Sequence, residues 1–125
     1  MIFHLNGHIK PYVRMTQRSK WVDRQAQEYI GSKTRLGRQM KQIMADHGFD
    51  MLPRCPLRVK IEILMTGGVH RCDLDNQVKA LLDAAQGIVF PDDRWVDVVE
   101  AHRIKSDEDL TILQVERWRG REDNK

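Results

Sequence analysis

The sequence predicts an α/β (α+β) fold, in which helices pack on a mixed β-sheet in the order β-α-β-α-β-β. Residues 57–65 alternate apolar and charged side chains, which is the period of a strand buried on one face. Residues 21–47 and 75–86 instead carry apolar side chains three or four positions apart, as amphipathic helices do. A length of 125 residues suits one domain, so we expect residues 1–125 to form a single unit.

The first half of the chain is expected to begin with a short strand at residues 2–9, followed by a basic loop at 10–20. The helix at 21–47 then ends before Gly48, a residue suited to a helix C-cap. Gly31 and Gly37 weaken the middle of this helix and leave room for a break.

The second half continues with the helix at 75–86, which Gly87 closes. Residues 95–105 and 110–118 are predicted to form the last two strands, with a hairpin loop at 106–109 between them. The polar residues 119–125 are expected to form a loose tail.

Composition indicates a globular chain of the cytoplasm. No apolar run approaches the roughly 20 residues that a membrane helix needs, and the N-terminus lacks the pattern of a signal peptide. Cys55 and Cys72 fit neither a zinc spacing nor a disulfide framework, so we expect reduced thiols.

Charge is distributed unevenly along the chain. Residues 1–60 contain 12 Lys and Arg against 4 Asp and Glu, whereas residues 61–125 contain 9 against 14. A basic half beside an acidic half suits a polyanion-binding surface next to a cation site, although a solvated charged surface has the same pattern. The cations that we expect to contact phosphates are Lys10, Arg14, Arg18, Lys20 and Arg71.

Acidic residues gather around the start of the second helix. Asp73, Asp75 and Asn76 precede Lys79 by one or two turns, and the pair Asp92 and Asp93 follows the helix after Pro91. Each aspartate alone suits a helix cap, an ion pair or a turn. Together they suit Mg²⁺, because in extended backbone residues 73 and 75 point the same way and carboxylate oxygens are its preferred ligands.

These residues resemble the RusA family of Holliday junction resolvases, small Mg²⁺-dependent endonucleases of bacteria and their phages. The resemblance rests on Asp73-Leu74-Asp75-Asn76, the following Lys79 and Asp83, and Phe90-Pro91-Asp92-Asp93, with a strand starting at Trp95-Val96. The order of elements agrees over nearly the whole chain.

The resemblance implies a RusA-like endonuclease that cuts branched DNA, chiefly four-way junctions, in recombination and repair. It implies that Asp73, Asp75 and Asp93 bind Mg²⁺, for which Mn²⁺ substitutes, and that Lys79 is the catalytic lysine. By the same resemblance, Asn76 and Asp92 are expected to support the site. It also implies a homodimer making paired symmetric nicks. The sequence departs from the basic run that precedes the first aspartate in some members, since only His70 and Arg71 stand there.

Two other functions fit parts of the pattern. One is a non-catalytic basic DNA-binding module in which the acidic residues are structural caps. The other is a phosphatase of the haloacid dehalogenase type, which also has an Asp-x-Asp after an apolar strand. That class needs a longer βαβ chain, and Gly67-Gly68 here separates the strand from the motif.

Overall fold

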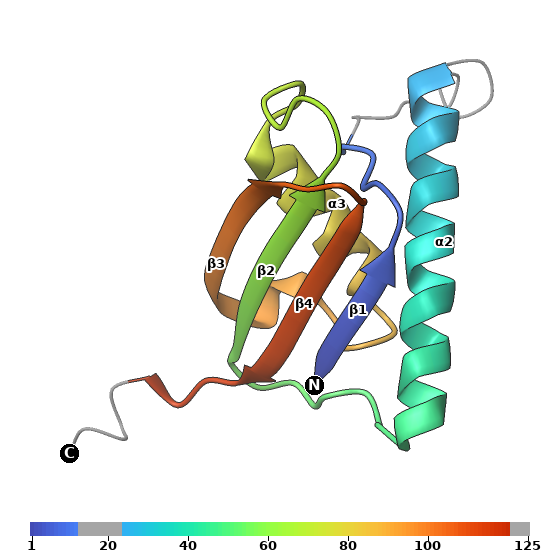
Figure 1. Cartoon of the computed structure of the whole chain (residues 1–125). Coiled ribbons are helices and arrows are strands. Elements are labelled where there is room, and N and C mark those ends of the chain that lie inside the picture. Colours follow the sequence, from blue (N-terminus) through green and yellow to red (C-terminus); the bar gives the residue numbers. More distant parts are fainter. Residues whose placement is uncertain (13–23, 121–125) are drawn as a thin grey trace.

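The computed structural model describes residues 1–12 and 24–120, and it contains one four-stranded mixed sheet with two helices. The predicted order β-α-β-α-β-β is confirmed (Figure 1). The elements are β1 (Ile2–Asn6), α2 (Arg24–His47), β2 (Leu57–Met65), α3 (Leu74–Ala85), a 3-10 turn (Asp93–Trp95), β3 (Val96–Lys105) and β4 (Leu110–Arg117).

The strands are ordered β1-β4-β2-β3 across the sheet. β4 pairs antiparallel with both β1 and β2, whereas β3 pairs parallel with β2. The parallel pair requires the chain to cross from one end of the sheet to the other, and α3 makes that crossing. The start of α3 therefore lies near the end of β2, and the turn after it lies near the start of β3.

The prediction of a hairpin at residues 106–109 is wrong. β3 and β4 lie on opposite sides of β2, so this segment crosses over the end of β2. Ser106 N donates to Met65 O at 2.8 Å, and Thr66 N donates to an Asp109 carboxylate oxygen at 2.9 Å, so both ends of the segment are fastened to the chain at that edge. Alternating side chains specify two strands but not which strand each will pair with.

Several element boundaries differ from the prediction by a few residues. β1 ends at Asn6 instead of residue 9 because Gly7 takes a positive φ of 99° and turns the chain. Asp93–Trp95 form a 3-10 turn, so β3 begins at Val96. β4 ends at Arg117, α2 is described from Arg24, and α3 spans Leu74–Ala85. Gly48, with a φ of 67°, follows α2 as predicted.

α2 runs without a break through Gly31 and Gly37. Gly37 is buried, and a β-carbon placed there would lie 3.1 Å from the Ile88 side chain. The glycine therefore lets the loop after α3 pack closely against α2, which compensates for its weak helix propensity.

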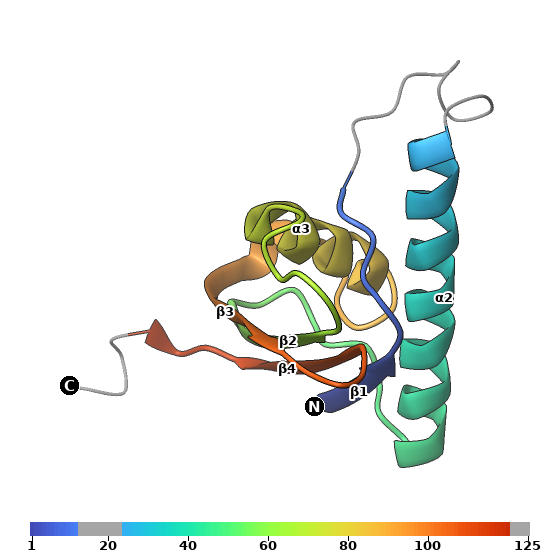
Figure 2. The same cartoon turned by 45° about the horizontal axis from the view of Figure 1, so that its top comes forward.

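The core lies between the sheet and the helices. Every second residue of β2, from Leu57 to Met65, is buried, as the alternating pattern predicts. Figure 2 shows α3 over one face of the sheet and α2 beside the β1 edge. The opposite face is formed by the other half of each strand, and no described helix covers it. Neither helix of the described residues is long and apolar enough to cross a membrane.

Candidate active site

The start of α3 presents two exposed carboxylates. Asp73 occupies the N-cap position with extended backbone (φ −76°, ψ 137°), yet its side chain makes no capping hydrogen bond. Asp75 lies in the first helical turn, where its carboxylate accepts from Asn76 N at 3.0 Å. The expectation that extended backbone aligns the two residues is wrong, because the helix begins at Leu74 between them.

A partly buried arginine holds the chain just before Asp73. Arg103 Nη1, from β3, donates to Cys72 O at 2.5 Å and to Gln77 Oε1 at 3.4 Å. Gln77 is completely buried, and its amide also contacts Met65 Sδ at 3.7 Å. This network ties the first turn of α3 to β2 and β3, and it fixes the backbone that carries both carboxylates.

Lys79, one turn after Asp75, points at an aromatic ring. Its ammonium nitrogen lies 3.9 Å from the centroid of Tyr12, within the range of a cation–π interaction. Tyr12 N in turn donates to Asn76 O at 3.0 Å, so the segment after β1 is fastened along α3. Lys79 therefore has a defined orientation although its side chain is exposed.

A second tyrosine connects α2 to the next turn of α3. The hydroxyl of Tyr29 donates to an Asp83 carboxylate oxygen at 2.7 Å. Burial, and then this hydrogen bond to an anion, raise the pKa of Tyr29 above its usual value. The Tyr12 and Tyr29 rings meet edge to face with centroids 5.5 Å apart. The two tyrosines thus link Lys79 with Asp83.

The turn after α3 brings two more carboxylates to this region. Asp92 accepts from Arg94 N at 3.0 Å and caps the 3-10 turn, while Asp93 N donates to Gln86 Oε1 at 3.2 Å. Burial raises the pKa of Asp93, and a hydrogen bond with Asp92 and the negative charges of Asp92 and Asp83 raise it further. The positive charge of Lys79 opposes that shift. Asp83, Asp92 and Lys79 therefore all lie close enough to Asp93 to act on its charge.

The predicted site residues thus divide into two groups. Asp92, Asp93 and Lys79 lie together with Asp83, whereas Asp73 and Asp75 lie at the first turn of the same helix. Among residues 1–12 and 24–120, no group of three or more Asp, Glu, His or Cys side chains is arranged to hold a metal ion. Of the predicted phosphate-binding residues, Arg14, Arg18 and Lys20 lie outside the described residues.

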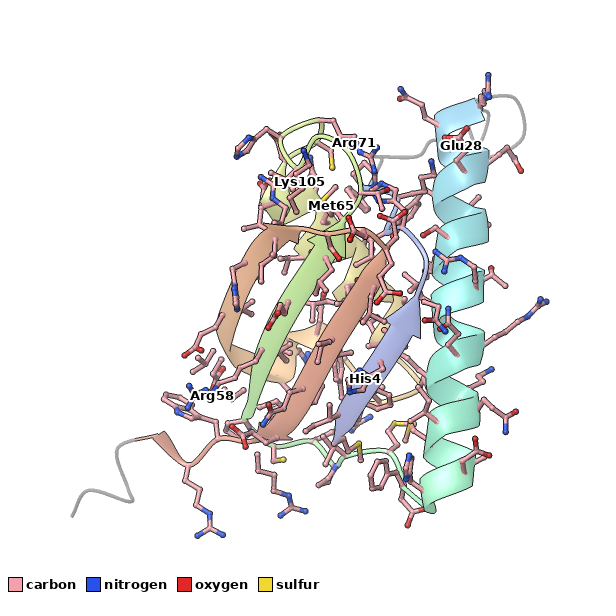
Figure 3. The ribbon with its side chains drawn as sticks, in the orientation of Figure 1. His4, Glu28, Arg58, Met65, Arg71 and Lys105 are labelled. Atoms are coloured by element: carbon pink, nitrogen blue, oxygen red, sulfur yellow. The ribbon has the colours of Figure 1, made fainter. Side chains whose placement is uncertain are left out.

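The remaining two predicted phosphate contacts border a cavity beside the start of α3. Lys10 lies 3.9 Å from Glu28, and Arg71 Nη2 lies 3.3 Å from His8 Nδ1. Figure 3 shows Arg71 at the same end of the molecule as Met65, the last residue of β2. The cavity, of about 820 Å³, has a lining that includes His8, Lys10, Tyr12, Arg71, Asp73 and Asn76.

The carboxylates of this region are the ligand type that a hard divalent cation prefers, although no three of the described ones are arranged around one position. Burial is the main cause of the raised pKa of Asp93, and the negative charges of Asp92 and Asp83 add to it; a bound cation would offset the part that comes from these charges. Mg²⁺ is typically bound by one or two carboxylates, with water and substrate phosphate as its other ligands. Both cysteines are free, and their soft sulfur atoms are unsuited to this ion.

Four residues that hold or orient the candidate site were not predicted from the sequence: Tyr12, Tyr29, Gln77 and Arg103. Only Gln77 carries a sequence signal, because it is a polar residue on the apolar stripe between Leu74 and Leu81. The partners of the other three are 26 to 67 residues away in the sequence or lie on another element.

Comparison with known proteins identifies the family. The family model described as endodeoxyribonuclease RusA matches residues 10–116, a range that includes Tyr12, both helices and the Asp92–Asp93 turn. A search of curated proteins finds no match. Because the family match covers most of the chain, this protein belongs to the RusA family of endodeoxyribonucleases.

Proposed function

We propose that this protein is a Mg²⁺-dependent endodeoxyribonuclease that resolves Holliday junctions by paired symmetric nicks, in DNA recombination and repair. The observation that carries the proposal is the arrangement along α3. Asp75, Lys79 and Asp83 recur every fourth residue over about 12 Å of one helix, and Asp93 lies beside the last of them. Membership in an endodeoxyribonuclease family supports the same activity.

Asp73, Asp75 and Asp93 are the proposed ligands of Mg²⁺, and Mn²⁺ is expected to substitute. A bound ion would supply activation of water for attack on the phosphodiester and neutralisation of charge on its oxygens. Asp73 and Asp75 stand on backbone that Arg103 holds in place, and the backbone N–H of Asp93 donates a hydrogen bond to Gln86 Oε1. The protein therefore offers carboxylates on two fixed elements.

Lys79 is proposed to stabilise the negative charge that develops on the phosphodiester. Its ammonium is already oriented by Tyr12, so little reorganisation is needed when the substrate binds. Asp92 supports the site by capping the turn that carries Asp93, and Asn76 supports it by holding Tyr12. Lys10, Arg14, Arg18, Lys20 and Arg71 are the proposed contacts to DNA phosphates.

The rival function, a non-catalytic DNA-binding module, requires the acidic residues to be structural caps. Asp73 stands at an N-cap position without making the capping bond, so its carboxylate does not serve the helix in that way. Asp92 does cap a turn, but its neighbour Asp93 does not, and the pKa of Asp93 is raised rather than lowered.

We also propose that the protein acts as a homodimer on branched DNA. A four-way junction presents equivalent strands in pairs, so a two-fold assembly can place one site on each. Sedimentation equilibrium tests this directly. A mass of twice 14.7 kDa in the micromolar range is expected, and a monomer that still cuts both strands at the same rate would contradict it.

The site assignment is tested by nicking of a synthetic four-way junction in Mg²⁺. Asp75→Asn and Asp93→Asn are each expected to lower the nicking rate by at least a hundredfold, while junction binding persists. Asp50→Asn, which removes an exposed carboxylate from the segment after α2, is the matched control and should leave the rate unchanged. Full nicking by Asp75→Asn would show that the site lies elsewhere.

A further inference from the structure

A groove runs between α2 and α3 on the side of the molecule that carries Asp83. It has a volume of about 640 Å³, and its floor includes the small residues Gly37 and Ala84. The α2 wall of the groove carries Lys33, Arg38 and Lys41, while Asp83 and Gln86 stand on the opposite wall.

The three cations of the groove are exposed, and no described acidic side chain forms an ion pair with any of them. Asp83 is the one acidic residue in the lining, and it already accepts the hydroxyl hydrogen of Tyr29. The groove therefore has an excess of positive charge directly beside the carboxylates of the proposed active site.

The spacing of the cations suits a nucleic-acid backbone. Lys33 and Lys41 are eight residues apart on one helix, which separates their α-carbons by about 12 Å. Successive phosphates of one strand of duplex DNA advance about 3.4 Å along the axis, so this length corresponds to three or four phosphates. A straight helix of 24 residues also offers a rigid surface for a duplex arm.

The position of the groove gives this charge a function. Carboxylates at Asp83, Asp92 and Asp93 repel a phosphodiester, and that repulsion acts on any DNA brought to the site. Cations on the adjacent helix α2 would offset this repulsion and attract the phosphates of the flanking duplex towards α3.

We propose that the groove between α2 and α3 is the track for one duplex arm of the DNA substrate, with Lys33, Arg38 and Lys41 contacting its phosphates. This inference rests on the proposed function, because it assigns the path of the DNA that the active site would cut. It is distinct from the basic segment at residues 10–20, whose described residues Lys10, Pro11 and Tyr12 line the other cavity.

The test compares two triple variants that remove the same charge. One changes the groove (Lys33→Ala, Arg38→Ala and Lys41→Ala), and the control changes three arginines near the ends of β2 and β4 (Arg54→Ala, Arg117→Ala and Arg119→Ala). Binding of a four-way junction is measured in EDTA at several salt concentrations. The plot of log affinity against log salt loses about 0.9 in slope for each lost phosphate contact, up to about 2.7 for three.

The expected result is a lower slope for the groove variant. The slope of the control should change by less than about 0.9, the value for one phosphate contact. Equal changes in both variants, or none in the groove variant, would overturn the proposal. Lys33→Arg with Lys41→Arg keeps the charge and should keep the wild-type slope, which separates loss of contacts from misfolding.

Cleavage by the wild-type protein is measured in Mg²⁺ with the same junction. If the wild type cleaves and the groove variant keeps its slope, the groove proposal fails while the proposed function stands. If the slope falls as expected but the wild type does not cleave, the groove is supported as a DNA-binding surface and the proposed catalytic function fails.

Discussion

The ammonium of Lys79 lies over the ring of Tyr12, with the nitrogen 3.9 Å from the ring centroid. The two residues are 67 positions apart in the sequence, and a backbone hydrogen bond from Tyr12 N to Asn76 O brings their segments together. A lysine side chain has four rotatable bonds, so an exposed one is ordinarily mobile. The tyrosine ring gives this ammonium one preferred position, on the helix that also carries Asp75 and Asp83.

Replacement of Tyr12 tests whether that position matters for cleavage. Tyr12→Leu removes the aromatic face and is expected to lower the rate constant for junction cleavage about two- to fivefold, since an exposed cation–π contact contributes roughly 0.5–1 kcal/mol. The Michaelis constant should change little, because Lys79 is proposed to act on developing charge. Tyr12→Phe keeps the ring and should retain most of the wild-type rate; a rate as low as that of Tyr12→Leu would contradict the role of the ring.

The hydrogen bond from Tyr29 to Asp83 is expected to stabilise the packing of α2 against α3. Tyr29 is 2% exposed, so water cannot easily take the place of its hydroxyl. Loss of the hydroxyl therefore removes this hydrogen-bond donor from the Asp83 carboxylate. Tyr29→Phe should lower the free energy of unfolding in urea by about 1–2 kcal/mol. Thr34→Ala removes an exposed hydroxyl from the same helix and serves as control, with an expected change below about 0.5 kcal/mol. Equal effects of the two changes would show that the Asp83 bond contributes little.

Arg103 is expected to control how well the first turn of α3 binds metal. Arg103→Met keeps the aliphatic stem but loses the bonds to Cys72 O and Gln77 Oε1. The backbone before Asp73 then loosens, so the Mg²⁺ concentration for half-maximal cleavage should rise roughly tenfold, as for lost supporting contacts at metal sites. Lys105→Met, an exposed change on the same strand, is the control. An unchanged Mg²⁺ requirement in Arg103→Met would contradict this role.

Asp109, in the segment that crosses over the end of β2, makes the stability of the protein depend on pH. The backbone hydrogen bond from Thr66 is the main reason that the pKa of Asp109 lies below its usual value, and burial partly opposes it. A lowered pKa in the folded state means that the ionised carboxylate stabilises the protein above the unfolded-state pKa of about 3.9. That contribution is lost as the pH falls through the lower folded-state value.

Asp109→Ala should therefore lower the free energy of unfolding by about 1 kcal/mol at pH 7, where both states of the wild type are ionised. The difference between variant and wild type should shrink as the pH falls below about 4. Urea titrations at pH 7, 5 and 3 measure it. A difference that grows on acidification would contradict the assigned hydrogen bonds.

The strands and helices could be predicted from the sequence because their signals are local. The alternation in β2 gave both of its ends correctly, and the apolar spacing of α2 and α3 predicted both helices. The pairing of β3 could not be predicted in the same way. Its partner is decided by the crossover through α3, and the alternation in residues 95–105 is compatible with a neighbour on either side.

Of the candidate site, the sequence predicted only the residues of the acidic motif. Asp73, Asp75, Lys79 and Asp93 form a recognisable spacing in one short stretch, whereas Tyr12, Tyr29 and Arg103 act across the fold. A tyrosine in a basic segment, or an arginine in an edge strand, carries no local sign of the group it will contact. These residues orient the charged ones, and tertiary packing alone brings them to the site.

The most direct test of the central claim is nicking of a synthetic four-way junction by the wild-type protein, in Mg²⁺ and in EDTA, with a linear duplex of the same sequence as control. The proposed function predicts paired nicks at symmetric positions in two opposing strands, in Mg²⁺ only and in the junction only. Tight junction binding without nicks in Mg²⁺ or Mn²⁺ would contradict it, and equal cutting of the linear duplex would contradict its selectivity for branched DNA.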